Sequence, residues 1–103
     1  MTKDARVLVD WVPEEQGGRN LLPDSEWYIT ISRFSDDGPK WPDGAWSVGV
    51  RFDEPPRSQG TPSHGTARFM MEDAPHERLQ PGTRFELFDG PQKTADVEVL
   101  DSE

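Results

Sequence analysis

Hydrophobic and polar residues alternate with a period of two along much of this chain. The clearest example is residues 45–53, in which small or charged residues separate four apolar ones, Trp46, Val48, Val50 and Phe52. A strand with one face buried and the other in water has this period, because successive side chains point to opposite faces. We therefore expect a half-buried strand here.

Five further stretches share the same alternation, namely residues 6–11, 27–32, 66–72, 85–87 and 95–99. In residues 66–72 the pattern places Ala67, Phe69 and Met71 on one face. Residues 27–32 are aromatic or β-branched at most positions, which suits a pleated surface. One face of this stretch carries Trp27, Ile29 and Ile31, and the other carries Tyr28, Thr30 and Ser32. The pattern thus predicts six short strands.

Glycine, proline and aspartate mark the connections between these stretches. Residues 14–20 predict a turn-rich loop, and residues 35–44 contain two prolines and two Asp/Gly turn signals. Residues 55–63 carry three prolines, so neither a strand nor a helix is expected. Residues 89–92 predict a hairpin, and residues 73–79 a single helical turn with Asp73 as its N-cap.

Six short antiparallel strands at this spacing imply a closed barrel or a small sandwich. We favour the closed barrel, because closure removes the exposed edges that so short a sheet would present. At 103 residues the chain has the size of one domain, so we expect residues 1–103 to form a single barrel.

Charge and composition exclude several function classes. The chain carries 20 acidic and 11 basic residues, for a net charge of -9, so phosphate backbones and anionic lipids should repel it. It has no cysteine, which excludes disulfides, thiolate metal sites and cysteine nucleophiles. The first residues lack the apolar stretch of a secretory signal, and no apolar run approaches the ~20 residues that span a bilayer. We expect a cytoplasmic protein that does not bind membranes.

Several segments, in the same order along nearly the whole chain, carry a family resemblance. The first predicted strand leads into the sequence EEQGGR at residues 14–19 and then into an aromatic-rich strand. Residues 67–71 lead through Pro75 to residues 79–87, which contain the motif GTRF, and residues 89–97 follow as a closing hairpin. This arrangement resembles the C-terminal domain of elongation factor Tu. The resemblance implies an all-β fold, a six-stranded antiparallel Greek-key barrel.

In that family the domain contacts the T-stem of aminoacyl-tRNA and partner proteins. The positions here that match its loop and its hairpin turn are Gly17, Gly18, Arg19 and Gly90. Pro91 and Gln92, however, replace a glycine and an arginine of that turn, which removes a backbone donor and a charge useful for phosphate contacts. Together with the net charge, these replacements argue against retained tRNA binding. The chain has no phosphate loop, so nucleotide binding and GTP hydrolysis are excluded.

Two loops are candidate binding sites. In the loop of Gly17, Gly18 and Arg19, the arginine could grip a carboxylate or phosphate. The structural alternative, which we favour, is that the glycines supply positive φ angles while Arg19 pairs with a nearby acid. Trp41, in the proline-rich loop, is either an anchor for a partner, since interfaces favour tryptophan, or a plug over one mouth of the barrel.

The titratable groups predict no reaction chemistry. His64 and His76 lie in different connections without carboxylates at ligand spacing, so we expect solvated or structural roles. The acids Asp36, Asp37 and Asp43 lack the spacing of a calcium loop and predict a solvated turn. No nucleophile–base pair or metal cluster is evident, so we expect neither an enzyme nor a bound metal or cofactor.

These observations favour a non-catalytic module that binds a protein partner through acidic loops and exposed aromatic residues. The acidity suits a basic partner, because opposite charge steers association. A regulator of translation or an immunity-type protein would fit. The alternative is a domain that contacts RNA or tRNA through Arg19 and the closing hairpin near Lys93.

Overall fold

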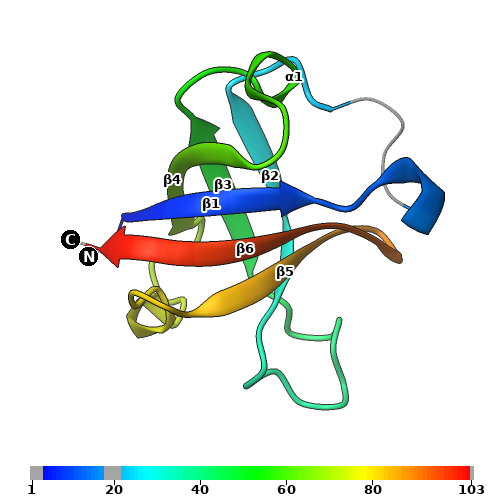
Figure 1. Ribbon diagram of the computed structural model, residues 1–103. Coiled ribbons are helices and arrows are strands. Elements are labelled where there is room, and N and C mark those ends of the chain that lie inside the picture. The colour runs from blue at the N-terminus through cyan, green and yellow to red at the C-terminus, as the bar shows by residue number, and fades with distance from the viewer. Residues whose placement is uncertain (1–3, 18–21, 103) are drawn as a thin grey trace.

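In a computed structural model of the protein, which describes residues 4–17 and 22–102, six antiparallel strands close into a barrel (Figure 1). The strands are β1 (Ala5–Trp11), β2 (Trp27–Arg33), β3 (Ser47–Phe52), β4 (Ser63–Phe69), β5 (Arg84–Asp89) and β6 (Gln92–Ser102). Their order around the barrel is β1-β4-β3-β2-β5-β6, and β6 pairs again with β1. Three short helical turns lie in the connections: η1 (Glu14–Gln16), α1 (Pro56–Gln59) and η2 (His76–Arg78). The predicted closed antiparallel barrel is confirmed.

The alternation of apolar and polar residues in the sequence corresponds to alternation between buried and exposed side chains in the strands. β1 and β4 alternate strictly between buried and exposed or half-buried residues, and Val48 on β3 is completely buried, as predicted. Aromatic rings fill the two ends of the interior. At one end Phe34 stacks on Phe85 with ring centroids 4.5 Å apart, and at the other Trp11 packs edge-on against Tyr28 at 5.4 Å.

β4 begins and ends three residues before the predicted stretch 66–72. Hydrogen bonding to β3 continues as far as Met70, whose N–H donates to the carbonyl of Ser47 at 3.0 Å. This distance is typical of a backbone hydrogen bond. The chain then turns, and Met71 is 55% exposed, so its predicted place beside Phe69 in the core is wrong. Leu79, further along, is fully buried instead.

Two of the predicted connections contain different local structure. Residues 55–63, expected to lack a helix, include the one-turn helix α1, whose first residue is Pro56. Proline is compatible with that position, because the first N–H groups of a helix have no partner within the helix. The predicted helical turn at 73–79 is the shorter η2; Pro75 stands at its N-cap position and no side chain caps it, so the expected role of Asp73 is wrong.

β2 presents its larger apolar side chains to the outside. Ser32 is completely buried and Tyr28 packs against the core, while Trp27 and Ile29 point outward. The inward polar groups have partners: the Ser32 hydroxyl donates to the carbonyl of Trp46 at 2.7 Å, and the Tyr28 hydroxyl lies 3.0 Å from that of Thr94. Buried polar groups are tolerated when they are hydrogen-bonded in this way.

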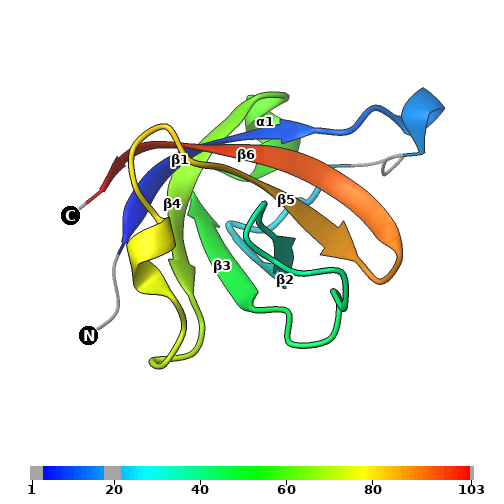
Figure 2. The ribbon, with the colours of Figure 1, turned by 90° about the horizontal axis from the view of Figure 1, so that it is seen from below.

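The barrel closes between β2 and β5 over a short distance. Only Ile31–Arg33 of β2 pairs with β5, where residues 86–88 are the partners, whereas β2 pairs with β3 from residue 27 to residue 31. The connection between β2 and β3, residues 34–46, projects below the barrel in Figure 1 and faces the viewer in Figure 2. No helix in the described part of the chain has the length and apolarity needed to cross a membrane.

Candidate binding surfaces

The structure brings together the two places that match the loop and the hairpin turn of the resembled family. Gly17 ends η1 with φ +91°, and its carbonyl accepts a hydrogen bond from the side-chain amide of Gln92 on the closing hairpin. Gly90 forms the turn of that hairpin with φ +60°. Gly18 and Arg19, the other two residues of this candidate site, lie outside the described residues.

Lys93, also on the hairpin, is engaged by the protein itself. Its ammonium lies 2.8 Å from Asp96 and 2.9 Å from Glu86. Hydrogen bonds to these two carboxylates, that to Asp96 first, raise the pKa of Lys93 above its usual value. A cation held between two acids offers little attraction to a phosphate.

Trp41 lies against the outer wall of the barrel and not across its mouth. Its indole N–H donates to the carbonyl of Ser32 at 2.9 Å, and its ring packs on Phe88 with centroids 4.6 Å apart. The guanidinium of Arg33 lies 5.3 Å from the centre of the ring. These contacts leave the side chain half-buried and hold the 34–46 connection against β2 and β5.

The acids of the same connection have partners within the protein. The carboxylate of Asp37 accepts the N–H of Phe34 at 2.7 Å and pairs with Arg78 at 3.1 Å. Asp36 lies 3.8 Å from the same arginine. These residues fasten the start of the connection to η2. Within residues 4–17 and 22–102, no three metal-ligating side chains are grouped so as to hold an ion.

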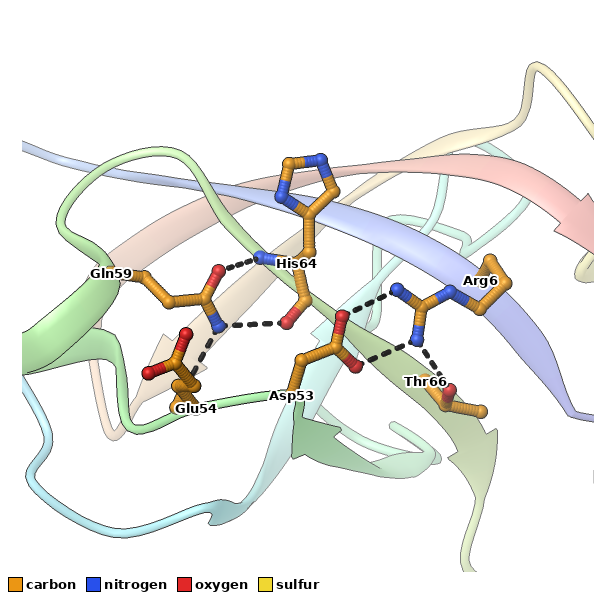
Figure 3. A network of polar contacts seen from close by, with 6 residues as sticks. All are labelled: Arg6, Asp53, Glu54, Gln59, His64 and Thr66. Carbon is orange, nitrogen blue, oxygen red and sulfur yellow. Dashed lines mark hydrogen bonds and ion pairs between the residues drawn. The ribbon is translucent and has the colours of Figure 1, made fainter.

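The two histidines lie apart. His76 places its Nε2 2.7 Å from the carbonyl of Glu72, and its ring meets the edge of Phe69 at 5.8 Å. His64 uses its backbone: its N–H and carbonyl both bond to the side-chain amide of Gln59, while its ring points away from this network (Figure 3). Two open clefts, of about 570 and 590 Å³, are lined by neither histidine.

Figure 3 also shows a polar contact that ties β1 to the end of β3. The two guanidinium nitrogens of Arg6 lie 2.8 and 2.7 Å from the carboxylate oxygens of Asp53, and Arg6 also donates to the Thr66 hydroxyl. This hydrogen bonding lowers the pKa of Asp53 and raises that of Arg6. Both side chains are about half exposed, so the pair stabilises the fold only slightly.

A surface that the sequence analysis missed lies on the outside of β2, β3 and β4. Trp27 and Ile29 are 47% and 58% exposed on β2, and Met70, just after β4, is 43% exposed. All three converge on Gly49 of β3: a Cβ built there would lie 2.6 Å from the Met70 sulfur, 3.6 Å from the Trp27 ring and 3.7 Å from Ile29 Cγ1. We call these four residues the β2–β4 apolar face.

Single exposed apolar residues are common on proteins, but apolar side chains that gather on one exposed surface mark interaction sites. The exposed side chains of the β2–β4 apolar face gather around Gly49 in this way, which makes the face a candidate site. Leu100 on β6, which is 44% exposed, is not among its side chains. One signal in the sequence pointed to this face: Gly49 interrupts a strand, and glycine inside a strand often marks a close approach of other groups.

Comparison with known proteins finds no matching family model and no similar curated protein.

Proposed function

We propose that this protein is a non-catalytic module that binds another protein through the β2–β4 apolar face. The convergence of Trp27, Ile29 and Met70 on Gly49 is the observation that carries the proposal. None of the three belongs to the buried core, which is formed by other residues such as Val48, Val50 and Phe69. Tryptophan in particular is enriched among the residues that dominate binding energy at protein interfaces.

The proposal keeps the partner class expected from the sequence but moves the binding surface. Trp41 already contacts the barrel and Asp37 pairs with Arg78 of η2, which leaves the 34–46 connection a smaller part in binding. The net charge of -9 acts at longer range, since it steers a partner with a basic surface toward the protein. The apolar face then supplies the contact area.

The barrel is, on this proposal, of the type found in the C-terminal domain of elongation factor Tu. The order of motifs along the chain and the closed antiparallel arrangement of six strands support that relationship. A component of the translation machinery, or a basic toxin, is then a suitable partner. The RNA-binding alternative gains no support from Lys93, because two carboxylates hold its ammonium.

Affinity capture with matched variants tests the proposal. The double substitution Trp27→Ser, Ile29→Ser removes the apolar face, and Leu100→Ser removes a comparably exposed apolar residue from β6. Truncating interface anchors costs about 1–2 kcal/mol or more, so we expect partner recovery to fall about tenfold in the double variant alone. Circular dichroism checks that both variants fold. Equal recovery by both variants would contradict the proposal.

A further inference from the structure

One arginine beside the β2–β4 apolar face has no carboxylate partner. Each strand carries one cation, and on five strands it pairs with an acid in the described residues: Arg6 with Asp53, Arg33 with Glu86, Arg68 with Asp4, Arg84 with Glu98, and Lys93 with Asp96. Arg51 on β3 is the exception within the described part of the chain. It is exposed and lies directly opposite Trp27 in the ladder between β2 and β3.

The nearby acids among the described residues form no ion pair with Arg51. Glu26 and Asp53 line the same shallow cleft as this arginine, but neither forms an ion pair with it. Both carboxylate oxygens of Asp53 instead accept hydrogen bonds from Arg6. Among the cations of the strands, Arg51 is therefore the one that no ion pair within the described residues occupies, and it lies beside the exposed Trp27.

We propose that the docking segment of the partner carries a carboxylate next to an apolar side chain, and that this carboxylate pairs with Arg51. The inference rests on the proposed function. A partner that covers Trp27 also removes water from the arginine opposite it, and a buried charge without a partner is strongly unfavourable. Arginine binds a carboxylate with two parallel hydrogen bonds, which fixes the position of the segment as well as its charge.

The same charge argues against a second copy of this chain as the occupant. In a twofold dimer the same surface patch meets itself, so the two copies of the face, each with its own Arg51, would be brought together. Each copy also carries a net charge of -9, which opposes association. The occupant is therefore a different protein, and its docking segment is locally acidic and apolar.

Selection from a phage-displayed library of short random peptides tests the inference. We expect the unmodified protein to select peptides in which aspartate or glutamate adjoins a large apolar residue. Arg51→Glu should weaken these peptides at least about tenfold and should select peptides with lysine or arginine at the same place. Lys40→Glu is the matched control, because Lys40 is also exposed and without an ion pair in the described residues, but lies in the 34–46 connection. It should leave the selection unchanged.

The outcomes separate this inference from the proposed function. Peptides that depend on Trp27 and Ile29, but lack an acid or bind Arg51→Glu equally well, would overturn the inference and leave protein binding intact. Failure to select any peptide that depends on Trp27 and Ile29 would count against the binding face itself. A dimer in size-exclusion chromatography that Trp27→Ser, Ile29→Ser abolishes would assign the face to a second copy and overturn the inference.

Discussion

Gly49 and Gly65 are surrounded by different kinds of atoms, so alanine at the two positions should change the stability of the protein by different amounts. At Gly49 the closest group to an added Cβ is the sulfur of Met70, the flexible end of a side chain that can move aside. At Gly65 on β4 the added Cβ would lie 2.7 Å from the carbonyl oxygen of Arg51 and 3.1 Å from the Cα of Phe52, which are backbone atoms. The backbone of a closed sheet cannot move aside without disturbing the ladder.

We therefore expect Gly65→Ala to destabilise the protein by about 1–3 kcal/mol, the range for overpacking in a core. Gly49→Ala should change the free energy of unfolding by less than about 1 kcal/mol, because alanine also relieves the entropic disadvantage of glycine in a strand. Urea unfolding of the two variants measures both values. A larger loss for Gly49→Ala than for Gly65→Ala would mean that the surroundings of the two glycines are described wrongly.

The first half of β2 is hydrogen-bonded to a neighbouring strand on one side only, that of β3. Backbone bonds from Phe52 to Glu26 and from Ser32 to Trp46 place the even-numbered residues of β2 toward β3. The N–H groups of odd-numbered residues therefore face β5, with which pairing begins only at Ile31. The N–H of Ile29 points toward β5 but lies outside the stretch of β2 that pairs with β5.

Hydrogen exchange can test this partial closure. We expect the amide of Ile29 to exchange much faster than those of Thr30 and Ile31, since both of these lie in paired parts of the ladder. Measurement of individual amides by NMR in the free protein gives the comparison directly. Equal protection at all three positions would show that β2 is paired along its whole length.

Trp41 holds the 34–46 connection against β2 and β5. The substitution Trp41→Ala removes the hydrogen bond to Ser32 and the ring contact with Phe88. We expect a loss of about 1–3 kcal/mol from these contacts, with the barrel still folded, because the ring lies outside the core. Thermal unfolding followed by circular dichroism measures it. An unchanged melting temperature would show that Trp41 is free to serve as an anchor.

Alternation along the chain predicts most of this barrel, and its failures have physical reasons. Val48, Val50 and Phe52 of β3 follow the pattern, since all three are buried and Arg51 between the last two is exposed. Met71 continues the alternation of β4 by chance, after the ladder with β3 has ended. In β2 both faces are aromatic or β-branched, so the pattern cannot tell that Trp27 points outward while Tyr28 reaches a buried threonine.

In the sequence only Gly49 pointed to the β2–β4 apolar face, for a related reason. Trp27 and Ile29 come from β2, while Met70 lies just after β4 and reaches Gly49 from the side of β3 opposite β2. Candidate residues chosen from loops, such as Trp41 and Lys93, are engaged by the protein's own groups. Only the register of the whole sheet separates side chains that pack in the core from those that stay exposed on its outer face.

For the molecule as a whole, the central claim is that the outside of β2, β3 and β4 contacts another protein. Site-specific photo-crosslinking is the most direct test: a photoreactive amino acid replaces Ile29 in one preparation and Leu100 in another, and cells that express the protein are irradiated. The account predicts a discrete crosslinked species of higher mass for the first and none for the second. The absence of any crosslink at Ile29, or the same crosslinks at both positions, would contradict it.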